Sequence, residues 1–229
     1  MVFDPEGLAA RGLVTGRSSG GRDGAVFFEL DGAALVLRRY RRGGMVRHLT
    51  ADRYVSLGAE RSRPMREFAL LLELETLGLP APRAHAARRT RHGPFESGAL
   101  VTHRLPGITL AERLAWAGGA GDDAPAPVPW EAIGRCVARF HVAGVLHADL
   151  NAHNVMVAGG GAGDASAVSL IDFDRGRRLD GPVPEARARA NVDRLARSID
   201  KLAAGAGREP ERAGVEALRT AWHERLSGR

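Results

Sequence analysis

Cysteine is nearly absent from this sequence, since Cys136 is the only one among 229 residues. A single thiol cannot form a disulfide within the chain, which excludes a disulfide-stapled secreted scaffold. The first residues lack the basic and apolar regions of a signal peptide, so we expect a cytosolic compartment. No stretch of about 18 apolar residues runs without a charge, so we expect no membrane span, although peripheral contact with a membrane stays open.

Lysine is equally scarce, and aromatic residues are few. Lys201 is the only lysine, so arginine supplies nearly all of the 33 basic residues that face 27 acidic ones. This bias looks compositional, so arginine-rich stretches are discounted as nucleic-acid sites. Few aromatic side chains accompany the densest stretch, and we expect it to bind anionic small molecules or lipid headgroups and no nucleic acid. Its arginines are Arg38, Arg39, Arg41, Arg42, Arg47 and Arg53.

Two short motifs carry chemistry. Residues 147–154 read HADLNAHN, and residues 170–174 read LIDFD. In the protein-kinase pattern H-R-D-L-x-x-x-N, the Asp accepts the proton of the attacking hydroxyl and the Asn holds Mg²⁺, while the Asp of D-F-G holds metal that bridges the phosphates of ATP. Asp149, Asn154 and Asp172 occupy those places. The sequence therefore predicts phosphoryl transfer from ATP with Mg²⁺.

The residues between the two motifs predict a hairpin. Residues 155–157 and 168–171 read as short apolar strands, and the glycine-rich stretch between them supplies a turn. We place the metal-binding positions at opposite ends of these paired strands. The alternative is purely structural, with Asp149 and Asn154 capping turns and Asp172 ending a strand.

The N-terminal part predicts nucleotide-binding elements. Residues 25–30 and 33–37 form a second hairpin around Asp31 and Gly32. The glycine-rich segment before it would cover ATP with Gly20 and Gly21, although an ordinary flexible loop has the same composition. The strand offers no lysine for the phosphates, so we assign this role to Arg38, with Arg39 as second choice. A helix over residues 64–77 carries its partner Glu67.

The remaining elements are mostly helical. After Pro82 we expect a loop, then a strand over residues 99–102 and a connector over residues 104–107. Helices follow over residues 110–116 and 130–143, and an amphipathic helical tail begins at Ala186. His141, on the second of these helices, is interpreted as a packed, hydrogen-bonded residue.

These elements predict an α+β protein of the two-lobed protein-kinase-like class. A small β-rich N-lobe would comprise residues 1–103, and a mostly helical C-lobe would comprise residues 104–229. The stretch from Arg175 to Arg189 is short and lacks A-P-E, so it offers no platform for a protein substrate. A small-molecule acceptor is favoured instead.

The motifs resemble those of the 3-deoxy-D-manno-octulosonic acid (Kdo) kinase family of Gram-negative lipopolysaccharide biosynthesis. The similarity extends from about Leu35 to Gly176. Besides the two motifs above, it includes the stretches LRRYRRGG at residues 37–44, REF at 66–68 and LGLPAPR at 77–83.

This resemblance implies an ATP-dependent, Mg²⁺-assisted kinase that phosphorylates a hydroxyl, expected to be the 4-OH, of Kdo on a Kdo–lipid A precursor. The enzyme would be peripheral on the cytoplasmic face of the inner membrane. Asp149 would deprotonate the sugar hydroxyl, Asn154 and Asp172 would hold Mg²⁺, and Arg38 with Glu67 would steady the triphosphate.

Three other functions stay open. A heptose kinase of the lipopolysaccharide core would share every catalytic residue. An antibiotic-modifying phosphotransferase is disfavoured, because its cleft is normally acidic and this chain is basic. A non-catalytic, kinase-like lipid-binding module would explain the missing lysine. The acceptor hydroxyl, the number of metal ions, the oligomeric state and the role of His153 are not fixed by the sequence.

Overall fold

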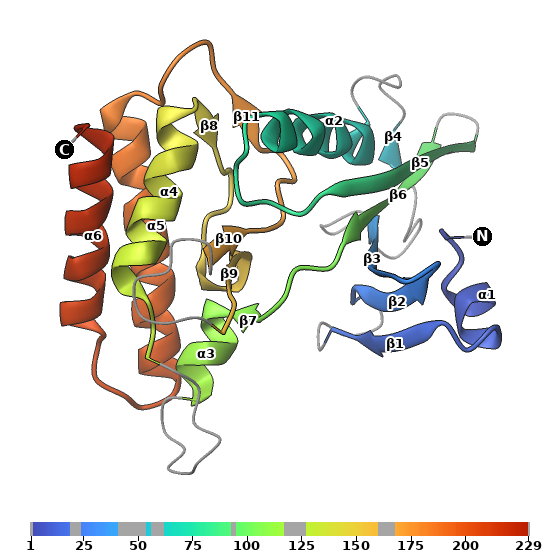
Figure 1. Cartoon of the computed structure of the whole chain (residues 1–229), viewed down its shortest axis with the longest axis horizontal. Coiled ribbons are helices and arrows are strands. Elements are labelled where there is room, and N and C mark those ends of the chain that lie inside the picture. Colours follow the sequence, from blue (N-terminus) through green and yellow to red (C-terminus); the bar gives the residue numbers. More distant parts are fainter. Residues whose placement is uncertain are drawn as a thin grey trace. The chain divides into compact units, whose positions relative to one another are not determined.

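We describe a computed structural model of the chain, covering residues 2–18, 24–40, 54–55, 62–92, 95–116, 127–159 and 168–228. The chain divides into two compact units (Figure 1). The first unit comprises Met1–Glu73 and Pro82–Arg104, and the second comprises Leu74–Ala81 and Leu105–Arg229.

The first unit is built on an antiparallel sheet. Its strands run in the order β1-β2-β3-β6-β4, with β5 pairing on β6. The short helix α1 (Pro5–Ala10) adds the buried Leu8 to the core of this sheet. The strands are β1 (Val14–Arg17), β2 (Val26–Leu30), β3 (Ala33–Tyr40), β4 (Tyr54–Val55), β5 (Ala84–His92) and β6 (Phe95–His103).

The hairpin of β2 and β3 confirms the pairing predicted from the sequence. Leu30 pairs with Ala33 across a two-residue turn. Asp31 and Gly32 in this turn have φ angles of 50° and 76°, the left-handed backbone that a tight hairpin requires. Along β3 the residues alternate between two faces, and Leu35 and Leu37 are buried on one of them.

The loop expected after Pro82 is wrong, because residues 84–92 form the strand β5. This strand pairs with β6 from Ala84↔Thr102 to His92↔Phe95. Its sequence, AHAARRTRH, is rich in alanine and arginine and lacks the run of β-branched residues that indicates a strand. Strand β5 forms because it pairs with the apolar β6, and no local sequence pattern predicts it.

Helix α2 (Arg63–Thr76) agrees with the predicted helix within one residue at each end. Its buried stripe contains Glu67, Leu70, Leu71 and Leu74, which are spaced i, i+3, i+4 and i+7. A carboxylate on the buried face of an otherwise apolar stripe needs a partner nearby.

The second unit contains four helices among its described residues. Figure 1 shows α4, α5 and α6 as neighbouring helices in this unit. Gly134 of α4 lies so close to α6 that an added Cβ would sit 2.1 Å from the carbonyl oxygen of Leu218. The helices are α3 (Leu110–Trp116), α4 (Trp130–Val142), α5 (Glu185–Gly205) and α6 (Arg212–Leu226).

Two small sheets complete the second unit. One has the strand order β10-β9-β7, and the other pairs β11 with β8. The predicted hairpin is confirmed, since Val155 pairs with Leu170 and Val157 with Val168. The elements are β7 (Ile108–Thr109), β8 (Val145–Leu146), β9 (Val155–Val157), β10 (Val168–Leu170), β11 (Arg177–Arg178) and the 3₁₀ turn η4 (Ala152–Asn154).

Gly144 ends α4 and directs the chain into β8. Its φ is 77°, and an added Cβ would lie 2.3 Å from the carbonyl oxygen of Gly181, so only glycine fits without displacing the backbone. The chain then reaches His147 directly after β8. Among the described residues, no helix combines the length and apolarity needed to cross a membrane.

Candidate active site

In the first unit, Arg38, Tyr40 and Glu67 form a charged cluster. The Arg38 Nη1 lies 3.0 Å from the Glu67 Oε1. The Tyr40 hydroxyl donates a short hydrogen bond to the other carboxylate oxygen. Glu67 is only 3% exposed, so both of its oxygens have a partner where water is scarce. A buried carboxylate is tolerated on these terms, because paired donors replace its hydration.

Alternation along β3 places the two arginines considered for the phosphate cation on opposite faces of the strand. Arg38 and Tyr40 share the face of β3 from which both reach Glu67, whereas Arg39 is exposed. The pairing of Arg38 with Glu67 reproduces the cation–glutamate pair expected between a strand and a helix in kinases. Gly20, Gly21 and four arginines of the dense cluster lie outside the described residues, namely Arg41, Arg42, Arg47 and Arg53.

In the second unit, the backbone carbonyl of Asp149 organises the HADLNAHN loop. This oxygen accepts hydrogen bonds from the side-chain amides of Asn151 (3.0 Å) and Asn154 (2.9 Å). The Asn151 Oδ1 in turn accepts from the backbone N–H of His153 at 2.9 Å. The fixed spacing of these residues in the motif therefore has a local cause: the asparagines fold the loop onto its own backbone.

The Asp149 side chain points away from this network. It is 58% exposed, and its Oδ1 lies 3.4 Å from the Arg194 Nη1 of α5. An ion pair between two half-exposed groups contributes about 0–1 kcal/mol. The carboxylate is thus held weakly and stays accessible to a substrate.

His147 links the two motifs. Its Nδ1 accepts from the backbone N–H of Asp149 at 3.2 Å, which leaves the proton on Nε2. The Nε2–H donates to the carbonyl oxygen of Ile171 at 2.9 Å, one residue before Asp172. The ring is buried and lies 4.9 Å, centroid to centroid, from the ring of Phe173. The imidazole acts as a bracket between the two loops.

Asn154 and Asp172 lie at the same end of the β9–β10 hairpin, so the expectation that they sit at opposite ends is wrong. The strands are antiparallel, Asn154 directly precedes β9, and Asp172 follows β10 by two residues. The N–H of Ile171 donates to the carbonyl oxygen of Asn154 at 3.0 Å, which joins the two loops. Antiparallel pairing brings the first residue of a hairpin to its last.

Asp172 has a φ of 64°, in the left-handed region that non-glycine residues seldom adopt. Such a conformation costs on the order of 1 kcal/mol, and it is concentrated at functional sites.

The donor set of Asn154 and Asp172 suits Mg²⁺. The Asn154 amide nitrogen is engaged with the Asp149 carbonyl, so its oxygen is the end left for a metal, and Asp172 offers a carboxylate. Mg²⁺ prefers such oxygen ligands and usually takes one or two from the protein, with phosphates and water as the rest. In the described part of the chain, no three His, Cys, Asp or Glu side chains gather into a metal cluster. Asn154 and Asp172 therefore fit a magnesium ion whose other ligands are phosphate and water.

A buried chain of hydrogen bonds supports the HADLNAHN loop from the side of the helices. The Trp222 indole N–H donates to the His141 Nδ1 at 3.0 Å, so the His141 Nε2–H donates to the Asn191 Oδ1 at 3.2 Å. The Asn191 amide then donates to the carbonyl oxygen of His147 at 2.8 Å. Three helices, α6, α4 and α5, thus reach the motif through one chain of hydrogen bonds.

These hydrogen bonds confirm the interpretation of His141 as a packed, hydrogen-bonded residue. Burial lowers the pKa of His141 below its usual value of 6.5, against an opposing contribution from its hydrogen bond to Asn191. Sequence reasoning missed Asn191. The only signal for Asn191 in the sequence is that it is a polar residue on the apolar stripe of the tail helix. That stripe also contains Ala188, Val192 and Leu195.

Comparison with known proteins places the chain in a family. The model of the "Lipopolysaccharide kinase (Kdo/WaaP) family" matches residues 9–220. A 3-deoxy-D-manno-octulosonic acid kinase of Xanthomonas axonopodis pv. citri (strain 306) is 44% identical over 208 residues, which cover 91% of this chain and 78% of the relative. The kinase of the same name from Stenotrophomonas maltophilia (strain R551-3) is 40% identical over 202 residues, covering 88% and 75%.

The fold agrees with this assignment. A solved structure of WaaP in complex with acyl carrier protein matches with a TM-score of 0.57 and 20% identity, over 96% of this chain and 83% of that one. The prediction of an α+β, protein-kinase-like fold is confirmed, with an antiparallel sheet in the first unit and a helical second unit. The chain belongs to the lipopolysaccharide kinase (Kdo/WaaP) family.

Proposed function

We propose that this protein is an ATP-dependent kinase that phosphorylates a hydroxyl of the Kdo residue on a Kdo–lipid A precursor. The observation that carries the proposal is the catalytic loop, in which Asp149 is exposed while its backbone is fixed by Asn151, Asn154 and His147. The relatives named as Kdo kinases, at 40–44% identity, support the acceptor.

Asp149 is the general base of this proposal. Its carboxylate takes the proton of the sugar hydroxyl as the hydroxyl oxygen bonds to the γ-phosphorus of ATP. The bond between that phosphorus and the β–γ bridging oxygen breaks, and ADP leaves. Positioned proton transfer of this kind contributes about 10²–10⁴-fold in rate.

Asn154 and Asp172 are the proposed holders of Mg²⁺. When bound, the ion would neutralise negative charge on the phosphates. His147 keeps both residues in register, since it bonds to the loop of each. In the first unit, Arg38 is the proposed phosphate cation, and Glu67 with Tyr40 fixes its position.

The 4-OH of Kdo is the proposed site of phosphorylation. An acylated, phosphorylated acceptor lies in a membrane, so the enzyme would act as a peripheral protein at the cytoplasmic face of the inner membrane. The basic balance of the chain, +6 at pH 7, suits an anionic surface.

The direct test supplies the protein with radiolabelled ATP, Mg²⁺ and either Kdo–lipid A or a heptosylated core acceptor. Label on Kdo–lipid A is the expected result, and NMR of the product would identify the phosphorylated hydroxyl. Label on the heptosylated acceptor alone would replace the proposal with a heptose kinase.

A further inference from the structure

Helix α5 runs alongside the catalytic loop, and successive residues of the helix contact successive residues of the loop. Asn191 donates to the carbonyl of His147, Arg194 contacts Asp149, and the Ser198 Oγ accepts from the backbone N–H of Ala152 at 3.1 Å. Residues 191, 194, 198 and 201 are spaced i, i+3, i+7 and i+10, so they occupy one face of the helix. We call these four residues the α5 stripe.

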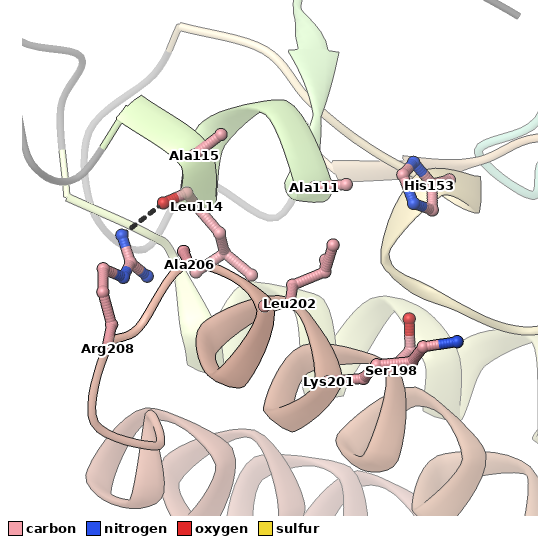
Figure 2. A pocket seen from close by; sticks show the side chains of 10 residues that line it. Ala111, Leu114, Ala115, His153, Ser198, Lys201, Leu202, Ala206 and Arg208 are labelled. Atoms are coloured by element: carbon pink, nitrogen blue, oxygen red, sulfur yellow. Dashed lines mark hydrogen bonds between the residues drawn. The ribbon is translucent and has the colours of Figure 1, made fainter.

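The fourth residue of the α5 stripe, Lys201, continues this order. It lines a pocket of about 520 Å³ together with His153, the residue after Ala152. Figure 2 shows this pocket, with Ala111 and Leu114 of α3 facing Leu202 of α5, and with His153 and Arg208 at its two ends. The volume is typical of ligand pockets, which are mostly apolar with a few polar groups.

The members of the α5 stripe divide into two kinds. Asn191 and Ser198 form hydrogen bonds with the backbone of the loop, so they hold it in place. Arg194 and Lys201 are exposed cations that flank Ser198 on either side. One stands at the proposed catalytic base and the other at the apolar pocket.

Arg208, at the far end of the pocket, is already engaged. Its guanidinium donates to the carbonyl oxygen of Leu114, drawn as the dashed line in Figure 2, and to the Glu211 Oε1 at 3.2 Å. It therefore ties the end of α5 to α3. Lys201 is the cation that the pocket offers to a ligand, since it is exposed and no partner for it is found among the described residues.

The contact of Arg194 with Asp149 is weak enough to be exchanged. At 3.4 Å, with the side chains 52% and 58% exposed, it holds neither group against a better partner. A carboxylate can pair with a guanidinium through two parallel hydrogen bonds. The carboxylate of an acidic sugar that binds here would pair with Arg194 in place of Asp149. The Asp149 carboxylate would then be free beside the sugar hydroxyl.

We propose that the α5 stripe and its pocket bind the acceptor. Arg194 takes the carboxylate of the acidic sugar, Lys201 takes a phosphate of the lipid, and the apolar pocket takes adjoining acyl chain. The ligand class is an acylated, phosphorylated glycolipid with an acidic sugar, which matches the stripe in its order of charge and apolar surface. This inference rests on the proposed function, because it names the acceptor subsites of that reaction.

The test measures binding and turnover in the full chain. Binding of Kdo–lipid A, dispersed in neutral detergent, is compared among the wild type, Arg194→Gln, Lys201→Gln and Arg189→Gln. The last variant is the matched control, since Arg189 lies on the same helix and pairs with Glu185. Loss of one charge-assisted contact should weaken binding about tenfold in the first two variants and leave the control unchanged.

A second acceptor separates the two subsites. With a Kdo saccharide that lacks phosphates and acyl chains, Arg194→Gln should raise the KM about tenfold, whereas Lys201→Gln should leave it unchanged. The KM for ATP should stay constant in every variant. These readouts would not move if the two cations only solubilised the helix.

Failure of this inference differs from failure of the proposed function. If the wild type transfers phosphate and both variants bind the glycolipid as tightly as the wild type, the α5 stripe is not the acceptor site. If a neutral acylated glycolipid competes as well as Kdo–lipid A, neither Arg194 nor Lys201 binds an anion. If the wild type binds through the stripe but transfers nothing, the kinase proposal fails and the binding site stands; if it does neither, both fail.

Discussion

The two candidate regions of this protein are held together in opposite ways. In the first unit, Arg38, Tyr40 and Glu67 contact one another through side chains alone. In the second unit, Asn151, Asn154 and His147 bond mainly to backbone groups of the catalytic motifs. Side-chain clusters can exchange one cation for another, whereas a loop built on its own backbone requires particular residues at particular spacings.

If Arg38 holds the phosphates, as proposed, this difference explains why an arginine can occupy the usual place of a kinase lysine while the HADLNAHN loop keeps its pattern. Arg38 can pair with Glu67 as a lysine would, through a longer and planar group. Replacement of Asn154 would remove both a proposed metal ligand and a hydrogen bond to Asp149. The comparison can be tested by breaking each region in turn.

Substitution of Asp172 should have the largest effect. Asp172→Asn removes the only carboxylate proposed to hold Mg²⁺, and we expect kcat for phosphate transfer to fall about 10³-fold, within the range for lost electrostatic catalysis. The melting temperature should hold or rise, since asparagine tolerates a positive φ at least as well. Unchanged turnover at saturating Mg²⁺ would remove Asp172 from the proposed site.

Loss of the arginine–glutamate pair should be visible in stability. Arg38→Met leaves Glu67 buried with one partner lost, and we expect the free energy of unfolding to fall by about 3 kcal/mol. The double variant Arg38→Met/Glu67→Leu should recover part of this loss, because no uncompensated charge stays buried. Urea unfolding measures both, with the exposed Arg39→Met as the control. Equal losses in the single and double variants would show that the pair is not coupled.

Asn191 tests whether the backbone bonds of the catalytic loop need support from the helices. Asn191→Asp keeps an acceptor for His141 but cannot donate to the His147 carbonyl, and Asn191→Leu loses both bonds. We expect kcat to fall about tenfold in each, because both lose the bond to the His147 carbonyl, worth about 1.5 kcal/mol, and the KM for ATP should stay unchanged. Full activity in Asn191→Asp would mean that the bond to His147 is not needed to position the loop.

His141 should give the smallest effect, visible in the pH dependence of stability. Burial lowers the pKa of His141 in the folded chain below its usual value of 6.5. Just below pH 6.5, the unfolded chain therefore binds a proton at His141 that the folded chain does not bind. Stability should therefore be complete above that pH and decline as the pH falls below it. Urea unfolding at pH 7.5 and pH 5.5 should show a smaller decline in His141→Gln than in the wild type. Parallel declines would assign the acid sensitivity to other groups.

The catalytic motifs were readable in the sequence because their side chains fold the loop onto nearby backbone. The β9–β10 hairpin agrees with the predicted strands within one residue, but it brings Asn154 and Asp172 to the same end and not to the opposite ends that were predicted. The helices α2, α3 and α4 were equally readable from their apolar spacing and stops.

Features created by partners distant in the sequence were not readable. Strand β5 depends on pairing with β6, and the bonds of Asn191 and Arg194 depend on how α5 packs on a loop some 45 residues earlier. Whether Arg38 or Arg39 meets Glu67 was also decided by tertiary packing, through the face of β3 that turns toward α2.

We propose that the exposed Asp149 makes this chain an active kinase and not a lipid-binding module with a kinase fold. The most direct measurement is phosphate transfer from labelled ATP to Kdo–lipid A by the wild type and by Asp149→Asn, with glycolipid binding measured on the same preparations. We predict label on the acceptor with the wild type, at least 10²-fold slower transfer with Asp149→Asn, and glycolipid binding by Asp149→Asn at least as tight as by the wild type. Glycolipid binding by both proteins with no label from either would contradict the assignment of Asp149 as the general base of an active kinase.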